Sequence, residues 1–401
     1  MANQWKQTFE IFFIFLRLGC TSFGGPVAHI SYFHQEFITK RKWLTNDAYT
    51  ELVALSHFLP GPASSQIGMA LGSIRGGVMG SLAAFFGFTI PSALLMALLG
   101  AGFLEYGQFL NPGILKGLQI AAVSVIVHAI IQMGQKLCPD KERVTLAILA
   151  AIGSNLIQGM FGQVLMIIIG GGIGLLFFRN VDSLPQISFN ANMTKKLGYW
   201  YLSIFLFLLV FLPLASTLFS NPLFNLFDRF YRIGSLVFGG GHVVIALLEE
   251  EIVQSGWIIR ETFLVGYGFA QTLPGPLFTI SAFIGAVISK GSYTFFIVLI
   301  CLCGAFLPGY LLMIGILPFW ESLHKVQSTA YVMKGISAVV VGLLFAVFYD
   351  PIFVSSVSGR LDFFLVSLSF VFLQFWKFPT WGIVLFLVTM YGITSQLGYQ
   401  V

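Results

Sequence analysis

Charged residues are scarce in this chain of 401 residues. They make up 9% of it, against 57% hydrophobic residues, and the mean hydropathy is +0.88. A soluble domain carries about 25% charged residues, so the composition excludes an ordinary soluble enzyme or binding module. Continuous hydrophobic runs of about 20 residues recur along the sequence, enough to cross a bilayer core of about 30 Å. These runs lack the alternation of apolar and polar residues that is typical of the strands of a membrane β-barrel. The sequence therefore predicts an all-α polytopic membrane protein.

Motifs for chemistry are also missing. The sequence contains no nucleotide-binding GxxxxGK[ST], no zinc-binding HExxH and no GxSxG of serine hydrolases. The four cysteines, Cys20, Cys138, Cys301 and Cys303, show no CxxC spacing, and we interpret them as small buried residues. The net charge of +5 comes from basic residues scattered among loops, so it does not indicate nucleic-acid binding. We expect no enzyme activity, no metal and no cofactor.

The hydrophobic pattern predicts about 12 or 13 transmembrane helices. The expected helices are 9–30, 48–73, 78–104, 113–136, 143–158, 161–178, 198–220, 224–247, 262–288, 292–319, 330–349, 361–376 and 378–397. The most polar stretch of the chain, 179–196, predicts a linker between two halves. We therefore divide the chain into an N-terminal repeat (1–178), a polar linker with a linker helix (179–223), and a C-terminal repeat (224–401).

The two halves repeat the same motifs in the same order. FLRLGCTSFGG at 15–25 matches FYRIGSLVFGG at 230–240, and FLPGP at 58–62 matches TLPGP at 272–276. Lys116-Gly117 matches Lys334-Gly335. The first expected helix corresponds to the eighth, and this odd shift makes the second half enter the membrane from the opposite side. The sequence thus predicts two inverted-topology repeats with broken helices, as in many secondary transporters, provided that helix 198–220 spans the membrane.

Charge offers weak support for the inversion. The predicted loop after the first glycine break carries Lys40, Arg41 and Lys42, whereas the equivalent predicted loop carries Glu249, Glu250 and Glu251. Opposite charges on equivalent loops fit opposite sides of a membrane. Other basic clusters do not follow this scheme, so the absolute orientation of the N-terminus stays open.

The glycine and proline motifs interrupt helices within hydrophobic sequence. Irregular backbone survives at membrane depth only where protein or a water-filled cavity covers it. In LPGP, the prolines bracket a glycine and a helical sequence follows, which is typical of a helix N-terminus. Such an end carries free N–H groups and about half a positive charge, so it favours anions. The alternative interpretation is that the motifs are tight packing points or kinks.

Polar residues beside the breaks are candidate ligands. Arg17 and Arg232 occupy equivalent positions in hydrophobic surroundings, and two guanidinium groups would match a tetrahedral dianion. The alternative is that both arginines reach the membrane interface. His57 and Gln271 also occupy equivalent positions and could donate hydrogen bonds, as either ligands or core residues. Ser64, Ser65 and Gln66 would extend the polar lining after the first LPGP motif.

Several stretches resemble the CHR family of chromate ion transporters. They are SFGGPVAHISYFHQEFITKRKWL, LPGPASSQIGMALGSIRGG and FTIPSALLM in the first half, and FGGGHVVIALLEEEIV and FAQTLPGPLFTISAFIG in the second. The resemblance covers both halves, as in the long two-domain form. It implies chromate efflux that confers resistance, with sulfate as a related anion. The family usually has glutamine where His57 stands. The family motif transfers onto Phe23, Gly24, Gly25, Pro26, Pro60, Gly61, Pro62, Gly239, Gly240, Pro274, Gly275 and Pro276.

The sequence thus predicts a multi-pass secondary transporter that exports chromate across a plasma membrane, such as a bacterial inner membrane. Its expected partners are a small anion, chromate or sulfate, and the lipid bilayer, with no nucleic acid. A homodimer stays open. Two alternatives remain. One is a transporter of sulfate or another oxyanion, by exchange or proton coupling. The other is a membrane scaffold or sensor without transport activity.

Overall fold

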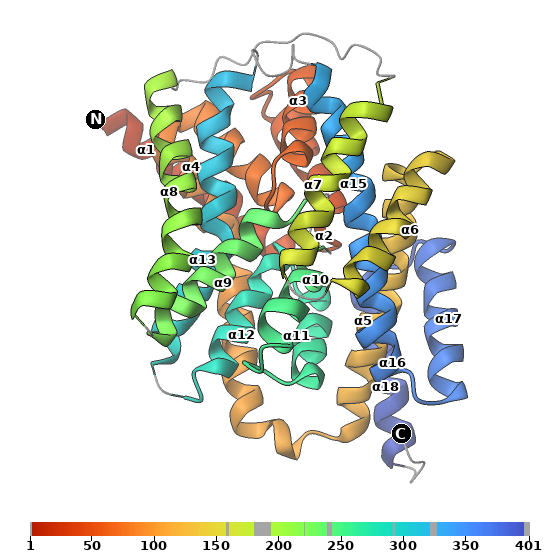
Figure 1. Cartoon of the computed structure of the whole chain (residues 1–401). Helices are drawn as coiled ribbons and strands as arrows, with labels where there is room; N and C mark the ends of the chain where they lie inside the picture. Colours follow the sequence, from red (N-terminus) through yellow and green to blue (C-terminus); the bar gives the residue numbers. More distant parts are fainter. Residues whose placement is uncertain are drawn as a thin grey trace.

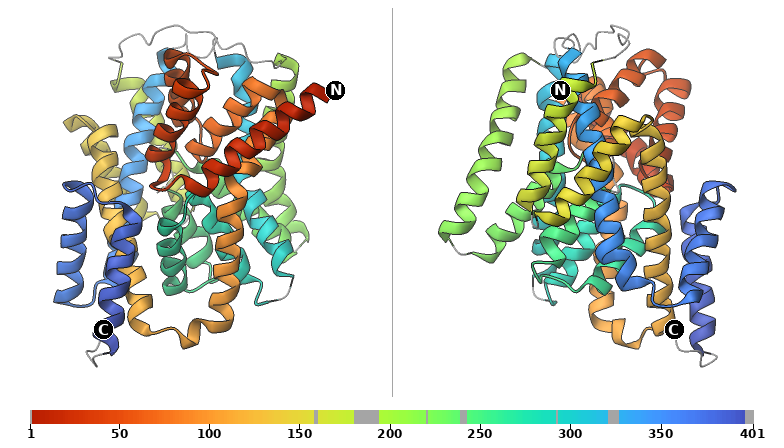
Figure 2. Two further views of the ribbon diagram at one scale, coloured as in Figure 1. Left: turned by 180° about the vertical axis from the view of Figure 1, so that it is seen from behind. Right: turned by 45° about the vertical axis from the view of Figure 1, so that its right-hand side comes forward.

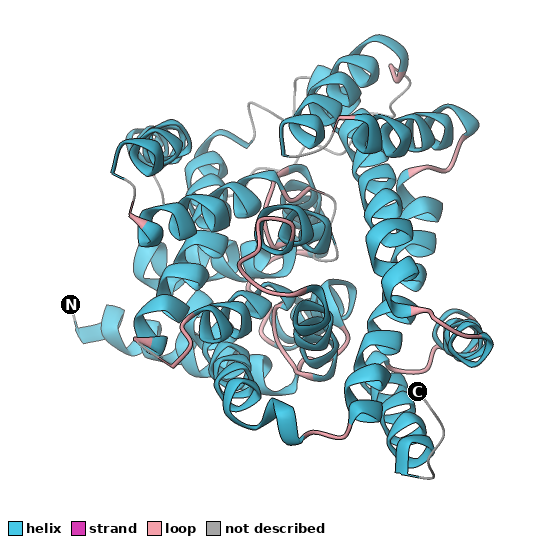
Figure 3. Cartoon of the chain, turned by 60° about the horizontal axis from the view of Figure 1, so that its bottom comes forward, coloured by secondary structure: helices cyan, strands magenta, loops and turns pink. Residues whose placement is uncertain are grey.

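The computed structural model describes residues 2–157, 160–179, 194–219, 221–238, 243–291, 293–320 and 327–396. Within these ranges every regular element is a helix (Figure 3). The longer helices of the first half are α1 (Ala2–Thr21), α2 (Gly25–Phe33), α3 (Asn46–Phe58), α4 (Ala63–Tyr106), α5 (Pro112–Leu137), α6 (Lys141–Leu156) and α7 (Met160–Phe177). Those that follow are α8 (Lys195–Phe219), α9 (Pro222–Leu236), α11 (Arg260–Thr272), α12 (Ile280–Ile288), α13 (Thr294–Ile316), α15 (Gln327–Val347), α17 (Arg360–Gln374) and α18 (Thr380–Gln396).

Short helical segments extend or join these helices. The π-helical segments are η1 (His34–Lys40), η4 (Glu249–Val253) and η7 (Phe348–Phe353). The 3₁₀ segments are η2 (Gly107–Phe109), η5 (Leu277–Thr279) and η6 (Leu317–Phe319). Two short α-helices, α10 (Val244–Leu248) and α16 (Val354–Ser356), complete the order.

Five helical stretches in the described part of the chain are long and apolar enough to cross a membrane. They are 63–109, 112–137, 195–219, 294–319 and 328–356. The all-α polytopic membrane fold predicted from composition is confirmed. The stretch 195–219 is α8, so the linker helix meets the length that the inversion argument requires. The boundaries predicted for the two repeats stay a prediction, and residues 180–193 of the linker lie outside the described part.

Helices break where the sequence places glycine and proline. In TSFGGP, α1 ends at Thr21 and α2 begins at Gly25. Gly24 and Gly25 have φ of 97° and 72°, a region that glycine enters without steric cost. Pro26 then lies in the first turn of α2, where its missing N–H costs nothing. The glycines are therefore required by the backbone itself.

The two halves enter the bundle from opposite ends. Figure 1 shows α1 beginning near the top of the view and α9 beginning near the bottom, with α8 running between these levels on the left. Similarly, α12 descends from the middle of the molecule, whereas the first part of α4 rises from it (Figures 1 and 2). A kink at Gly76 and Gly77 turns α4 back, at the boundary expected between helices 48–73 and 78–104.

Equivalent glycines make equivalent close approaches in both halves. A Cβ on Gly19 of α1 would lie 2.6 Å from the Phe88 carbonyl oxygen in α4. In the second half, a Cβ on Gly234 of α9 would overlap the Ala305 carbonyl of α13. Small residues let helix backbones meet closely inside membranes. The sequence repeat is therefore also a repeat of packing.

The C-terminal hairpin of each half packs on the other half. The hairpin α6–α7 packs against α15, and the hairpin α17–α18 packs against α5, which Figure 2 shows along the side where α5 and α18 run together. Gly117 of α5 lies against the backbone of α18, and its equivalent, Gly335 of α15, lies against the backbone of α7. The repeats are thus interlocked, and neither forms a compact unit alone.

Candidate functional site

The four breaks meet in reciprocal pairs at the centre of the molecule. The Gly61 N–H of the first LPGP loop donates a hydrogen bond to the Val237 carbonyl of the second half, at 2.7 Å. The Gly275 N–H of the second LPGP loop donates to the Ser22 carbonyl of the first half, at 3.0 Å. Ser22 and Val237 are equivalent residues of the repeat. We call this arrangement of Ser22, Gly61, Val237 and Gly275 the crossing.

Only glycine fits at the two loop positions of the crossing. Gly61 and Gly275 have φ of 125° and 101°, and residues other than glycine rarely adopt such positive values of φ. A Cβ on Gly61 would lie 2.9 Å from the Gly309 Cα, and a Cβ on Gly275 would lie 2.6 Å from the Ser92 Oγ. Gly309 and Ser92 again belong to opposite halves, so each loop is wedged against the other repeat.

The prolines of the loops direct the following helices away from the crossing. Pro62 directly precedes α4 and provides no side-chain cap. The positive end of α4 therefore faces the crossing without a capping side chain, and such an end favours negative charge. In the second half, Pro276 precedes the 3₁₀ segment η5, which leads into α12. Pro60 and Pro274 occupy the loops themselves.

Unsatisfied polar atoms gather on the residues that flank the crossing. The side-chain atoms there that are buried without a hydrogen-bond partner among the described residues include Ser22 Oγ, His29 Nδ1, His57 Nε2, Ser65 Oγ, Gln66 Oε1, Gln271 Nε2 and Ser281 Oγ. An unpaired polar group in a membrane interior costs several kcal/mol. The Gln66 Oε1 can only accept a hydrogen bond, but the hydroxyl, imidazole and amide N–H groups in this set can donate hydrogen bonds to an anion. The set therefore suits a polar ligand.

One of the predicted ligands, Gln66, is also part of the scaffold. The Gln66 Nε2 donates to the Pro60 carbonyl at 2.8 Å and to the Gly309 carbonyl at 3.3 Å. It thereby ties the first LPGP loop to the second half. Ser64 is buried beside Ser65 in the first turn of α4.

Both predicted arginines form ion pairs within their own half. The Arg17 Nη2 lies 2.7 Å from the Glu36 Oε1. The Arg232 Nη2 lies 2.9 Å from Asp228 and 3.3 Å from Glu251. Glu36 and Glu251 are equivalent residues, so the repeat conserves the pair. These contacts favour a positioning role for the arginines, with their charge compensated by carboxylates.

The acidic cluster 249–251 differs from the loop that the sequence predicted, whereas Arg41 and Lys42 follow the end of η1 and lie outside any helix. Glu249 and Glu251 are buried in the helical segment η4, where Arg260 lies 2.9 Å from Glu249 and Arg229 lies 3.1 Å from Glu251. Their charge therefore neutralises arginines and says nothing about the side of the membrane. Glu36 and Glu251 are separated by the same offset of 215 as Arg17 and Arg232, and this shared offset is the signal in the sequence that links the carboxylates to the arginines.

The remaining predicted residues are placed as follows. Phe23 is partly exposed, at 37%, and lies beside Gly24 in the first break. Gly239 and Gly240 lie outside the described residues. His29, only a minor candidate from the sequence, is fully buried, and its Nε2 lies 3.1 Å from the Ser22 carbonyl at the crossing. In the described part of the chain, no group of three or more His, Cys, Asp or Glu residues is arranged to hold a metal.

Fold and crossing together define a polytopic α-helical membrane protein with two interlocked repeats and broken helices at its centre. The chain belongs to the chromate transporter family, whose sequence profile matches residues 9–175 and 224–393. It is 27% identical to a chromate transport protein of Pseudomonas aeruginosa, over 85% of this chain and 80% of that protein. It is 24% identical to a chromate transport protein of Cupriavidus metallidurans, over 84% and 80%.

An uncharacterized transporter of Methanocaldococcus jannaschii is similarly related, at 25% identity over 84% of this chain and 83% of that protein. These relatives extend across both repeats, as the resemblance to the long form predicted. No solved structure matches the chain.

Proposed function

We propose that the protein is a secondary transporter that exports chromate, a tetrahedral dianion, through the crossing, and so confers chromate resistance. The observation that carries the proposal is the reciprocal bonding of the two LPGP loops, Gly61 to Val237 and Gly275 to Ser22. This bonding brings unpaired polar atoms of both repeats toward the N-terminus of α4, which has no capping side chain. Membership of the chromate transporter family supports chromate as the anion.

The proposed substrate contacts are neutral donors and backbone. Ser65, His57 and Gln271 each carry a buried polar atom without a partner among the described residues, and they flank both LPGP loops. Hydrogen bonds from neutral groups hold an anion weakly enough to release it, as a transport site requires. Arg17 and Arg232 are proposed to position the broken helices through Glu36 and Glu251.

Export needs no energy source besides the membrane potential. Moving one charge across about 100 mV is worth about 2.3 kcal/mol, so a dianion gains about 4.6 kcal/mol when it leaves a cell that is negative inside. That gain corresponds to a ratio of about 1,000 between the chromate concentrations outside and inside the cell. The proposed location is the plasma membrane, where such a potential exists.

Transport by right-side-out and inverted membrane vesicles tests the proposal. With radiolabelled chromate and an imposed potential, we expect flux toward the positive side, inhibited by excess unlabelled chromate. A parallel titration with sulfate decides the alternative, because hydrogen-bond donors alone accept any tetrahedral dianion. If sulfate inhibits at lower concentration than chromate does, sulfate is the better substrate. Flux of neither anion above that of vesicles without the protein would refute transport and leave the scaffold or sensor role.

A further inference from the structure

A polar stripe runs along one face of the largely apolar helix α5. It consists of His128, Gln132 and Lys136, whose spacing of four residues aligns side chains on an α-helix. The Nε2 atoms of His128 and Gln132 lie 2.9 Å apart. The stripe lies within the stretch 112–137, which is long and apolar enough to cross a membrane. Because polar and ionisable side chains are costly there, they mark substrate pathways or water-filled cavities.

The polar stripe leads toward the crossing. Lys136 lies close enough to His57 for its charge to act on the imidazole. The hairpin α17–α18 packs on α5, and the Thr380 hydroxyl at the start of α18 donates a hydrogen bond to the Gln271 carbonyl at 3.4 Å. His57 and Gln271 flank the two LPGP loops, so polar groups continue from the stripe to both loops.

Lys377 adds a second positive charge beside the stripe. It lies in the turn between α17 and α18, and its charge acts on His128. Lys136 and Lys377 are both exposed, and neither forms an ion pair within the part of the chain that the structure describes. By contrast, carboxylates compensate Arg17 and Arg232 beside the breaks. The two lysines are therefore available to attract an anion.

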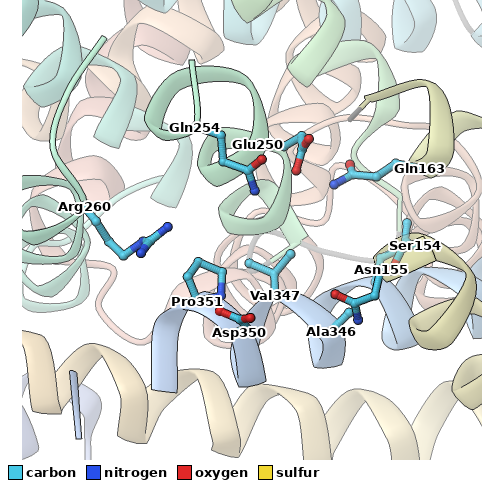
Figure 4. Close-up of a pocket in the computed structure, with 11 residues that line it drawn as sticks. Ser154, Asn155, Gln163, Glu250, Gln254, Arg260, Ala346, Val347, Asp350 and Pro351 are labelled. Atoms are coloured by element: carbon cyan, nitrogen blue, oxygen red, sulfur yellow. The ribbon is translucent and has the colours of Figure 1, made fainter. Parts of the chain in front are cut away.

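The equivalent region of the second repeat lacks these lysines. At the offset that relates Lys116 to Lys334, the stripe corresponds to Ala346, Asp350 and Val354. Figure 4 shows Asp350 beside a polar pocket of about 180 Å³, between the hairpin α6–α7 and the segments η4 and η7. Two carboxylates and one arginine line this pocket, and no lysine is among its described lining residues. The repeats are therefore equivalent in packing but not in charge, and the two lysines mark one approach to the crossing.

We propose that the anion reaches the crossing along the polar stripe, and that Lys136 and Lys377 draw it there electrostatically. This role rests on the proposed anion transport and adds the approach and the residues that attract the substrate. Lysine suits the role because its flexible, hydrated ammonium attracts an anion without holding it in a fixed geometry. Charges of this kind act mainly on the rate of association and on its salt dependence.

Labelling of a cysteine placed in the stripe tests this approach without any transport. The full-length protein carries Gln132→Cys, together with Cys20→Ser and Cys303→Ser, which remove the exposed cysteines. It is treated in liposomes with an anionic sulfonate and with a cationic ammonium methanethiosulfonate. We expect the anionic reagent to react at least about threefold faster than the cationic one, each relative to its rate with a free thiol in solution.

The lysine variants then decide whether these two charges cause the preference. Adding Lys136→Gln or Lys377→Gln should lower the ratio of the two labelling rates at least about threefold, whereas Lys136→Arg should keep it. Lys290→Gln is the matched control, because Lys290 is exposed and has a positive φ of 48°, close to the 54° of Lys377. It should leave the ratio unchanged.

Chromate flux in phosphatidylcholine liposomes connects the stripe with transport. At low ionic strength, Lys136→Gln and Lys377→Gln should each raise the chromate concentration at half-maximal flux at least about threefold and leave the maximal flux unchanged. At about 1 M salt the difference should disappear, because charges are then screened beyond about 3 Å. Lys290→Gln should match the wild type under both conditions.

Three outcomes would overturn the proposal. The first is the absence of labelling at position 132 by either reagent, which would place the stripe against lipid. The second is a labelling ratio that the lysine substitutions leave unchanged. The third is an effect on flux that appears only when the liposomes contain anionic lipid, because the lysines would then bind lipid headgroups. No chromate flux in the wild type, with the labelling pattern retained, would instead refute the proposed function and leave an approach that attracts anions.

Discussion

Replacing Gly275 by alanine should separate the two repeats at the crossing. At φ of 101°, a residue with a Cβ costs about 1–2 kcal/mol relative to glycine. The new Cβ would also lie 2.6 Å from the Ser92 Oγ and 3.0 Å from the Ser92 Cβ, and overpacking of this kind costs about 1–3 kcal/mol. We therefore expect Gly275→Ala to destabilise the protein by about 2–5 kcal/mol.

The assay is thermal unfolding of the purified protein, with Gly102→Ala as the control because no atom lies within 4 Å of a Cβ built there. For a chain of this size, the expected loss lowers the unfolding temperature by about 2–6 °C. Adding Ser92→Ala removes the nearest clashing atom, so the double variant should recover part of the loss but keep the backbone strain. Equal unfolding temperatures for Gly275→Ala and Gly102→Ala would refute the wedged crossing.

Three further sets of substitutions test the arginines, the histidine and the interlocking of the two repeats. Arg232→Gln should lower both transport and stability, the latter by about 3–5 kcal/mol, because it removes the arginine that pairs with the buried Asp228 and one of the two arginines that pair with Glu251. Arg17→Gln should reduce transport with a smaller loss of unfolding temperature, since Arg17 is 57% exposed. Full transport in both variants would contradict a positioning role. His57→Gln should keep chromate flux in vesicles and His57→Leu should lose most of it, whereas equal flux in the two would exclude hydrogen bonding by this side chain. Gly335→Val should prevent the α6–α7 hairpin from packing on α15, because the valine side chain would overlap the α7 backbone. Size-exclusion chromatography should then show aggregation. The control variant Gly172→Ala, where a Cβ meets open space, should elute as the wild type does.

The breaks could be predicted from sequence because their causes are local. Glycine permits positive φ and proline suits a first helical turn, so TSFGGP and LPGP mark their own positions. The kink at Gly76 and Gly77 follows from the same property. Matching motifs at a constant offset then indicated the repeat, and the odd helix shift indicated its inversion.

The partners of these breaks could not be predicted, because they come from the other half. Nothing near Gly61 in the sequence says that its N–H bonds Val237, or that Gly309 fills the space beside it. The exchange of hairpins between the repeats is hidden for the same reason. The arginines show the limit most clearly. Asp228, one partner of Arg232, lies four residues away, but the partners at equivalent positions of the repeat, Glu36 and Glu251, lie 19 residues from their arginines.

The most direct test of the central claim is chromate flux through the purified protein in liposomes with an imposed membrane potential. The wild type and Gly102→Ala are compared with the double variant His57→Leu/Gln271→Leu, which removes one unpaired polar side chain beside each LPGP loop. The account predicts potential-driven flux in the first two proteins and its loss in the double variant, at equal amounts of folded protein. Undiminished flux in the double variant would contradict an anion path through the crossing.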